Sequence, residues 1–462
     1  MSNTKDLIGE QETLDRLISH NLESLEDNDI KSLRNYCFYN NKTIKSVNLP
    51  NCEQKSSKSH VFENCYNLHT VSLPSASYIG NNQFSNCYKL KNINLKDNVF
   101  IGDSAFNNCF SLNNINVNGG AIGSTSSRCF SGTGIGKLVL LDSFLGNGYI
   151  FSSSRISVLD LIHDTKGDNI SLYQYALQSA CSLVHLIIRR NNTIVISSSD
   201  TFLKDTPIKD GIGWIYVPSD LIDTYKSATN WSTYADQIVS IDEYPKSLQN
   251  ETISDSWEEI FQAEDNNTYK TKYNIGDIKY LIVGETYVPM QIIAFDRDIL
   301  SSDETSTAKI TWLSKGLSFS FPMNFTSNTT GGWGNSECRK FLNDTIYEQI
   351  PQNVKNKILS VNKTYTTASQ SSSTTIGSDK LWIPSAREMY GINFYENSGV
   401  DYTDYFSNST MKTKSSGLTS TTSSYYLRSV YSLSSFQSVS NIGNISNTDA
   451  SNVGQFLLGF CT

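Results

Sequence analysis

The sequence predicts a mainly β chain in which a solenoid of short repeated strands precedes a separate α+β domain. Three observations lead to this fold class. A pattern of Phe, Cys, Leu and two further apolar residues at fixed offsets recurs every 22 residues, most clearly over 62–73, 84–95 and 106–117. Apolar and polar residues alternate at the end of each copy, as in a strand with one buried face. After about residue 245 this period is lost, and strand-like and helix-like segments are mixed.

The repeats are expected to stack, because one unit of this size cannot bury its apolar face alone. Weaker copies extend the series to eight units, which begin at Phe38, Phe62, Phe84, Phe106, Phe130, Phe151, Leu177 and Phe202. Residues 1–35 are expected to cap the first unit, with an amphipathic helix over 10–20. Residues 218–244 are expected to form a closing helical cap. The solenoid is therefore predicted over 36–245, followed by a polar linker over 246–255.

The repeat resembles the BspA-type leucine-rich repeat, in which Ala-Phe precedes a Cys, a Leu, a β-branched residue and a final apolar residue followed by Pro. The stretch 105–117 carries this pattern nearly whole, and Leu73-Pro74 carries its end. The resemblance covers about residues 30–245. It implies an adhesive or partner-binding solenoid and not a catalyst.

The charge and the distribution of apolar residues limit the function classes. The formal net charge is −8, whereas a protein that binds nucleic acid is expected to carry a basic surface. No run of about 18 apolar residues is present, so a membrane-spanning helix is not predicted. The first residues lack the apolar core of a secretory signal. We therefore expect no nucleic-acid partner and no membrane insertion.

The nine cysteines are expected to be free thiols. Five of them lie in or beside the Phe turn of a repeat: Cys37, Cys65, Cys87, Cys109 and Cys129. A small thiol packs in such a turn without a disulfide, and no CxxC pair indicates a zinc site. Cys338 and Cys461, in the second half of the chain, are expected to be core residues. This pattern favours folding in a reducing compartment.

The second half is expected to mix strands, short helices and loops. Two antiparallel strands are predicted on either side of a turn at Gly284. A helix is predicted over 331–343 with Ser336 as its N-cap. Two tracts rich in Ser and Thr, over 364–378 and 412–424, are predicted to be loops with little to pack.

This half resembles a family of C-terminal domains of unknown function found in bacterial and bacteriophage proteins. The matching motifs lie at 290–296, 331–339, 382–388, 425–429 and 458–461. Their order is also similar to C-type-lectin-like folds of the formylglycine-generating-enzyme branch. The resemblance implies an α+β C-type-lectin-like domain over 256–462 that displays a ligand-binding surface.

The segment 425–462 is the candidate ligand-binding region. It is rich in Ser, Asn and Tyr and poor in charge, a composition that binding loops use because it combines rigid aromatic area with adaptable hydrogen bonds. A Ser- and Asn-rich β-region without a ligand is the alternative. The residues expected to be displayed are Tyr431, Phe436, Ser440, Asn441, Asn444, Ser446, Asn447 and Asn452.

No catalytic or metal site is predicted. The acidic group Asp296, Asp298, Asp303 and Glu304 could supply oxygen ligands to calcium. It lacks the spacing and the glycine of an EF-hand loop, so a solvated acidic loop is expected and calcium is the weaker alternative. A copper- or calcium-dependent activating enzyme is the weakest interpretation, because the two cysteines of this half are interpreted as core residues.

We therefore expect a non-enzymatic recognition protein without a cofactor. The first hypothesis is a bacteriophage tail or receptor-binding protein, because a solenoid adhesin with free thiols and no export signal suits a virion assembled in the host cytoplasm. Its partners would be a host cell-surface glycan or protein and other virion proteins, and a homo-oligomer is compatible with this hypothesis. The alternative is a bacterial cell-surface leucine-rich-repeat adhesin.

Overall fold

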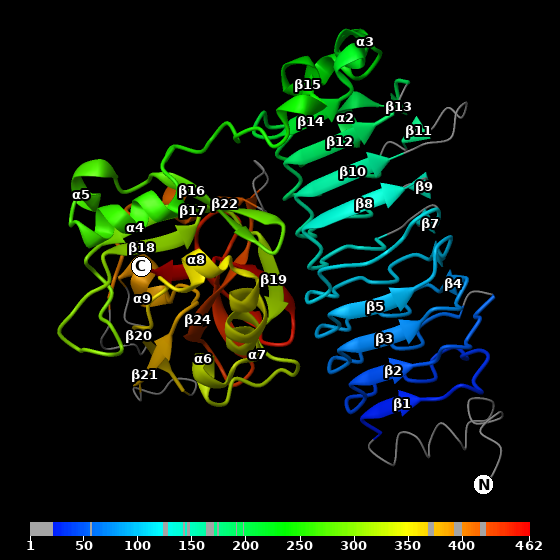
Figure 1. Ribbon diagram of the computed structural model, residues 1–462. Helices are drawn as coiled ribbons and strands as arrows, with labels where there is room; N and C mark the ends of the chain where they lie inside the picture. The colour runs from blue at the N-terminus through cyan, green and yellow to red at the C-terminus, as the bar shows by residue number, and fades with distance from the viewer. Residues whose placement is uncertain are drawn as a thin grey trace. The chain divides into compact units, whose positions relative to one another are not determined.

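A computed structural model of the chain describes residues 22–55, 58–122, 128–141, 144–145, 148–162, 171–172, 175–190, 192–196, 198–367, 374–391, 400–415 and 422–462. For 144–145 and 171–172 it describes the backbone alone. The chain divides into two compact units, Met1–Gln249 and Asn250–Thr462 (Figure 1). Among the described helices, none combines the length and the hydropathy that crossing a membrane requires.

The segment predicted as a linker over 246–255 is hydrogen-bonded to both units. The Gln249 N–H donates to the carbonyl oxygen of Ile212 in the first unit (3.3 Å), and the Ile253 N–H donates to that of Ile278 in the second (3.0 Å). The boundary between the units lies inside the predicted segment, but most of that segment belongs to one unit or the other.

The first unit is a solenoid of parallel strands (Figure 1). One sheet consists of β1 (Ser24–Glu26), β2 (Ser46–Asn48), β3 (Thr70–Leu73) and β5 (Asn92–Leu95). A second consists of β8 (Lys137–Leu141), β10 (Val158–Ile162), β12 (His185–Arg189), β14 (Trp214–Val217) and β15 (Ile238–Ser240). Between these two sheets, the predicted strand of the Phe106 repeat over 112–117 forms only an isolated bridge, from Asn114 to Asn92 of β5, so the predicted ladder is interrupted there.

Shorter parallel strands lie along another side of the solenoid. They are β4 (Tyr78–Ile79), β6 (Phe100–Ile101), β7 (Ala121–Ile122) and β9 (Phe144–Leu145) in one sheet, and β11 (Ser171–Leu172) and β13 (Val195–Ile196) in another. These strands were not predicted from the sequence. Several turns of the chain therefore have an extended segment on two sides, and apolar side chains form the core of the solenoid.

The repeated side chains explain why successive turns stack in register. The leading Phe rings are parallel, with centroids 5.0 Å apart between Phe38 and Phe62 and 5.3 Å apart between Phe62 and Phe84, and the stacking continues through the next repeats. In the first four repeats an Asn lies two residues after the Phe and has a left-handed φ, 61° at Asn64 and 60° at Asn86. Asn tolerates this conformation better than most residues. The predicted repeat register is confirmed over this part of the solenoid.

The end of the solenoid closes with helical turns and one further strand. After α2 (Ser199–Phe202) come η2 (Ser219–Leu221), α3 (Ile222–Ser227), η3 (Ser232–Gln237) and η4 (Ile241–Glu243). Tyr225, Trp231 and Tyr234 are buried, and Trp231 Nε1 donates to the carbonyl oxygen of Ile194 (2.6 Å). The closing cap is confirmed, and β15 adds a strand to it. The helix predicted over 10–20 lies outside the described residues.

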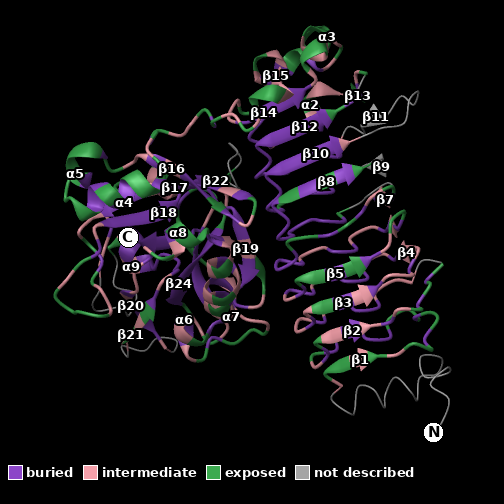
Figure 2. Ribbon diagram, viewed as in Figure 1, coloured by how far each residue is buried: buried purple, intermediate pink, exposed green. Residues whose placement is uncertain are grey.

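The second unit is built around two larger sheets. One has the order β16 (Ile278–Val283), β17 (Thr286–Phe295), β18 (Ile310–Ser314) and β28 (Gly459–Cys461). The other has the order β19 (Phe319–Pro322), β27 (Val453–Phe456), β24 (Tyr425–Val430), β25 (Ser435–Val439) and β26 (Ile445–Asp449). The antiparallel hairpin predicted around Gly284 is confirmed as β16 and β17. The strand β24 is buried along its whole length (Figure 2).

Short helices join these strands. They are α4 (Trp257–Asp265), α5 (Tyr269–Lys272), α6 (Gly332–Asn335), α7 (Glu337–Lys340), η5 (Phe341–Ile346), η6 (Tyr347–Gln349), α8 (Gln352–Lys355), α9 (Ala386–Tyr390) and α10 (Ser409–Lys412). Ser336 caps α7 as predicted, because its hydroxyl accepts the Arg339 N–H (3.1 Å). The single helix predicted over 331–343 is instead divided into α6, α7 and η5.

The two Ser- and Thr-rich tracts contain paired strands, so the prediction of loops was wrong in part. The strand β20 (Val361–Thr366) pairs with β21 (Thr374–Asp379), and β22 (Lys414–Ser415) pairs with β23 (Thr422–Ser423). Residues 368–373 and 416–421 of these tracts lie outside the described residues. Partners in the folded unit, and not local composition, decide the structure of these strands.

Candidate recognition surface

The candidate residues lie on the last strands of the five-stranded sheet. The strand β26 is at the edge of that sheet and pairs with β25. Asn441, Asn444, Ser446 and Asn447 are all exposed, the first two in the β25–β26 turn and the other two on β26 itself. We call these four residues the polar edge. An edge strand leaves one row of backbone groups available to a partner.

The turn that carries the start of the polar edge is fixed by internal hydrogen bonds. The Ser440 N–H donates to the carbonyl oxygen of Asn444 (2.7 Å), and the hydroxyl of Tyr390 donates to that of Gly443 (2.8 Å). Gly443 has a φ of 81°, and a Cβ there would lie 2.5 Å from the carbonyl oxygen of Ser409. Only glycine fits such a position. The side chains of Asn441 and Asn444 are thus presented by a rigid turn.

Two of the predicted display residues have other roles. Phe436 is fully buried, so its prediction as a ligand contact was wrong. Residues 436–439 of β25 are all buried. The strand therefore lacks the alternation of buried and exposed residues that would leave Phe436 exposed. Ser440 is half-buried, and its hydroxyl accepts the Asn444 N–H (3.2 Å), so it supports the turn.

The remaining candidates lie at the other end of the hairpin. Tyr431 is 46% exposed in the β24–β25 turn, and Asn452 is exposed in the β26–β27 turn. A five-residue strand such as β25 is about 16 Å long. The predicted residues therefore form two groups at opposite ends of the hairpin, joined by Ser446 and Asn447 on β26.

Sequence reasoning missed several residues of this surface. Leu433 is 77% exposed in the β24–β25 turn, and Ile442 is 63% exposed in the β25–β26 turn. The loop 324–330 also reaches the Tyr431 end, where the Thr329 N–H donates to the carbonyl oxygen of Leu433 (3.1 Å). An apolar residue between polar turn residues was the available signal for Leu433 and Ile442. The loop 324–330 had no such signal, because it is about 100 residues away in the chain.

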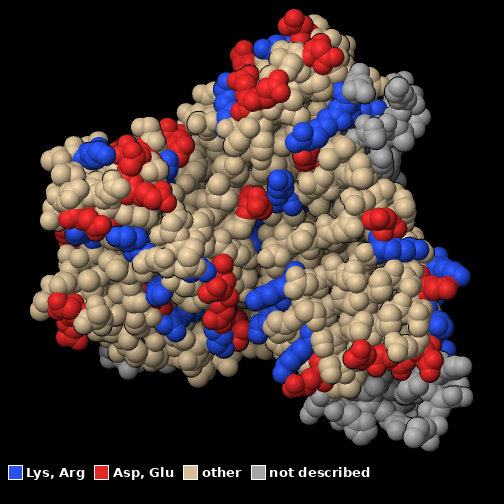
Figure 3. Space-filling view, viewed as in Figure 1, with Lys and Arg blue, Asp and Glu red and all other residues tan. Residues whose placement is uncertain are grey.

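The surface carries little charge. Asp449 is its one acidic side chain among the described residues of 425–462, and Arg428 is buried. Burial raises the pKa of Asp449, but hydrogen bonds from Ser451 and Ser327 lower it below its usual value overall. The carboxylate of Asp449 therefore accepts hydrogen bonds that stabilise the β26–β27 turn. On the face of the molecule seen in Figure 3, acidic and basic side chains are interspersed, with no field of one sign.

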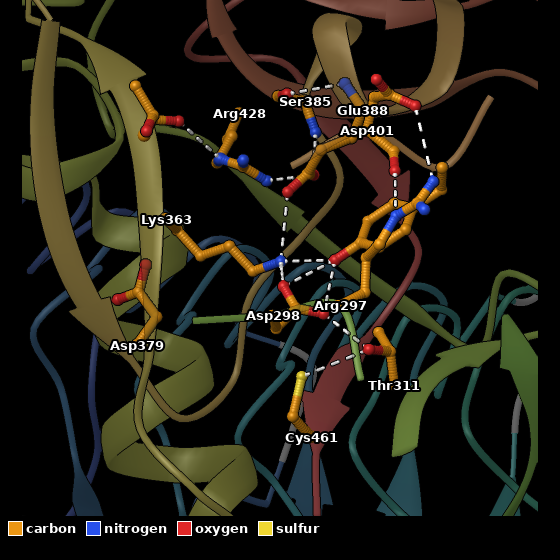
Figure 4. Close-up of polar contacts among 12 residues, drawn as sticks. Arg297, Asp298, Thr311, Lys363, Asp379, Ser385, Glu388, Asp401, Arg428 and Cys461 are labelled. Atoms are coloured by element: carbon orange, nitrogen blue, oxygen red, sulfur yellow. Dashed lines mark hydrogen bonds and ion pairs between the residues drawn. The ribbon is translucent and has the colours of Figure 1, made fainter. Parts of the chain in front are cut away.

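A buried ion network lies behind this sheet (Figure 4). It consists of Asp298, which follows β17, Lys363 of β20, Glu388 of α9 and Arg428 of β24. Lys363 Nζ lies 2.6 Å from Asp298 Oδ1 and 3.1 Å from Glu388 Oε1, and Arg428 Nη1 lies 2.5 Å from Glu388 Oε2. The four side chains are at most 2% exposed. Two carboxylates and two cations leave the network electrically neutral.

Further hydrogen bonds satisfy the remaining atoms of the network. The hydroxyl of Tyr402 contacts both carboxylate oxygens of Asp298 (2.7 and 2.8 Å), and the hydroxyl of Thr311 donates to Oδ2 (2.6 Å). Arg428 Nη1 donates to the carbonyl oxygen of Ile383 (2.7 Å). Glu388 also accepts the Ser385 N–H (2.9 Å) as half of a capping box at the start of α9.

The network keeps its charges at neutral pH. Burial by itself raises the pKa of Asp298, but the attraction of Lys363 and the surrounding hydrogen bonds lower it below its usual value. Burial also raises the pKa of Glu388, and Arg428 and Lys363 reverse this effect. The pKa of Lys363 is raised, because the two carboxylates outweigh its burial. One of these buried groups, Arg428, belongs to β24 of the sheet that carries the polar edge.

The acidic residues considered for calcium do not converge. Asp298 belongs to the buried network, so the expectation of a solvated loop was wrong for it. Asp296 pairs with Lys270, and the carboxylate of Asp303 accepts hydrogen bonds from its own turn. Within the described ranges, no cluster of three or more His, Cys, Asp or Glu side chains could hold a metal ion.

Cys338 and Cys461 are fully buried free thiols, which confirms their prediction as core residues. The Cys461 Sγ lies 3.9 Å from the hydroxyl oxygen of Thr311, at the border of the ion network. The seven other cysteines are also buried and free. The prediction of buried thiols in the repeats is therefore confirmed.

Two family models match the chain. Residues 19–135 and 77–209 match the BspA type leucine rich repeat region, in six copies, and residues 313–455 match a domain of unknown function (DUF6273). The first unit is therefore a solenoid of BspA-type leucine-rich repeats. The second match covers the sheet that carries the polar edge and includes Lys363, Glu388 and Arg428.

One solved structure is similar to the chain in part. It is a leucine rich cell surface protein from Faecalibacterium prausnitzii, with 15% sequence identity and a TM-score of 0.23. The match covers 36% of this chain and 64% of that one, so the chain spans less than two thirds of its length. A search of curated proteins finds no significant match.

Proposed function

We propose that the chain is a non-enzymatic recognition protein of the bacterial cell surface, in which the solenoid is an arm and the second unit presents the ligand surface. The BspA-type repeats support an adhesive role, because stacked repeats offer a long open surface to partners. The C-type-lectin-like assignment of the second unit is part of the proposal. The motif resemblance supports it, as does the pairing of β28 with β18, which joins the last strand of the unit to an early one.

The polar edge is the observation that carries this proposal. Its amide and hydroxyl groups both donate and accept hydrogen bonds, and a rigid turn and a buried ion network hold the strands behind it. Preorganised groups lose little conformational entropy when they bind. Because the surface is nearly uncharged, the ligand is a neutral, hydrogen-bonding one, such as a cell-surface glycan or an uncharged protein surface.

The test compares two double variants of the full chain. Asn441→Ala with Asn447→Ala removes two amides of the polar edge, and Asn353→Ala with Asn356→Ala removes two exposed amides elsewhere in the second unit. Binding is measured on whole bacterial cells and on an array of neutral oligosaccharides. We expect the first variant to lose tenfold or more in affinity and the second to bind as the natural chain does. Equal binding by both variants would contradict the proposal.

One observation favours a second candidate, a component of a bacteriophage virion. Nine free buried thiols suit a protein that folds in a reducing cytoplasm, where virions assemble. In that case the partners would include other virion proteins and a host receptor, and the polar edge would serve the same role. Detection of the chain in purified particles supports this candidate, whereas detection in the cell-envelope fraction alone supports the first.

A further inference from the structure

The buried ion network places an amine against a carboxyl group in the interior of the second unit. Lys363 Nζ lies 2.6 Å from Asp298 Oδ1. It also lies 3.4 Å from the centre of the Trp382 ring, which covers it on one side. The side chains of Lys363 and Asp298 are 1% and 0% exposed. Two groups that can condense to an amide are therefore held in contact, one on β20 and the other on the segment between β17 and β18.

A third group at the same nitrogen can accept and deliver protons. Glu388 Oε1 lies 3.1 Å from Lys363 Nζ, on another face of the amine from Asp298 (Figure 4). A carboxylate within hydrogen-bond reach of the proton that it abstracts meets the geometric requirement for a general base. The hydroxyls of Tyr402 and Thr311 hydrogen-bond the Asp298 oxygens and can stabilise the negative charge that develops there.

The charges of the network also favour condensation. Burying an ion pair is costly, even where its geometry is good. Formation of an amide removes the charges of Lys363 and Asp298 together and releases one water molecule. Glu388 then keeps Arg428 as its partner at 2.5 Å. No unpaired charge therefore remains among the four side chains after the amide forms.

We propose that Lys363 and Asp298 form an intramolecular isopeptide bond, with Glu388 as the group that transfers the protons. One proton passes from the Lys363 ammonium to Glu388, and the nitrogen lone pair attacks Cγ of Asp298 to form the C–N bond. The C–O bond breaks with its electron pair on oxygen. The proton from Glu388 and a second proton from the nitrogen join that oxygen, which leaves as water. No oxidant, reductant or cofactor takes part.

The bond ties β20 to the segment between β17 and β18, across 65 positions of the sequence. It fixes the interior of the second unit covalently, next to the sheet that carries the polar edge. The inference goes beyond the proposed function and does not depend on it. A second unit that binds nothing could still contain the bond.

The first test is the mass of the intact full-length chain under denaturing conditions. We expect it to be lower than the sequence mass by one water molecule. Trypsin digestion should then give a branched peptide that joins residues 298–309 to residues 358–380, with no cleavage after Lys363. The full sequence mass, together with cleavage after Lys363 in the natural chain, would overturn the proposal without the use of any variant.

Variants locate the reaction. Lys363→Met removes the nucleophile and Glu388→Gln removes the proton carrier, so both should give the unmodified mass. Asp298→Asn can give the same amide with loss of ammonia, and should yield the same branched peptide. Lys414→Met, at another buried lysine of this unit, is the control and should keep the bond. A branched peptide that persists in Glu388→Gln would remove Glu388 from the reaction, and one that joins other residues would overturn the assignment.

Discussion

The Sγ atom of Cys87 lies 3.1 Å from the carbonyl oxygen of Phe62, in the preceding repeat of the solenoid. The same contact recurs between Cys109 and Phe84 (3.1 Å). The thiol is a weak donor that satisfies a buried carbonyl between two turns of the chain. The cysteine of the repeat is therefore a small apolar residue with one hydrogen bond, and it needs no disulfide or metal to explain it.

We expect these thiols to be unreactive in the folded chain. All nine cysteines are buried, and burial raises the pKa of Cys65 to about 12 and that of Cys52 to about 11. The thiolate is the reactive form, so Ellman's reagent should detect almost no thiol within minutes under native conditions and nine in denaturant without reductant. Fewer than nine thiols in denaturant would indicate a disulfide and contradict the structure.

The asparagine ladder gives a second prediction. Asn86 has a φ of 60°, donates to Asn64 Oδ1 (2.8 Å) and accepts from Asn108 Nδ2 (2.8 Å). Asn86→Gly loses the two hydrogen bonds but keeps the conformation at little cost, whereas Asn86→Ala loses the bonds and adds about 1–2 kcal/mol of left-handed strain. Urea unfolding should rank the two variants in that order. An Ala variant as stable as the Gly variant would show that the backbone carries no strain there.

The sequence predicted most of the solenoid, because each repeat specifies its own structure. Phe62, Cys65 and Leu68 recur at fixed offsets, and a fixed period needs no knowledge of distant contacts. The stretch 106–117 carries the same pattern, but its predicted strand forms only a bridge to β5. The offsets identify which side chains are buried in the core, and they do not determine whether a strand is long enough to pair.

The candidate surface was harder to predict, because long-range pairing decides it. Asn444 and Asn447 were correctly expected to be exposed, whereas Phe436 lies on a strand covered on both faces, which local alternation does not reveal. The ion network was missed for a similar reason. Glu388 and Arg428 lie in recognised motifs, but Asp298 was assigned to a solvated loop and Lys363 adjoins a tract predicted to be a loop. Only the folded unit brings the four together.

We expect the ion network to be essential for the stability of the second unit. Arg428→Met removes one of the two cationic partners of Glu388 and the donor to the carbonyl oxygen of Ile383. Loss of one member of a buried pair costs about 3–5 kcal/mol. The matched control is Lys340→Ala, which breaks a partly exposed ion pair with Glu337 and should cost less than about 1 kcal/mol. Urea unfolding measures both, and equal losses in the two variants would show that the network contributes no more than a surface pair.

The last prediction concerns Glu264, a buried residue of α4 whose Oε1 accepts a hydrogen bond from the hydroxyl of Thr462 (2.6 Å). Burial raises the pKa of Glu264 from 4.5 to about 7. In the folded chain this carboxyl therefore keeps its proton at pH values where the unfolded chain has lost it. Between about pH 4.5 and 7 the folded state binds more protons than the unfolded state, so the free energy of unfolding falls as the pH rises.

The variant Glu264→Gln keeps the size and the acceptor oxygen of the side chain but carries no charge. It should equal the natural chain in stability below about pH 4.5 and exceed it by roughly 1–3 kcal/mol at pH 8, because each unit of pKa shift corresponds to about 1.4 kcal/mol. The measurement is urea unfolding from pH 4 to 8, with Glu258→Gln, at an exposed position of the same helix, as the control. A Gln variant that is less stable than the natural chain at pH 8 would mean that the carboxylate is stabilised in the folded state, by Lys309 or another cation nearby, and that burial does not govern its titration.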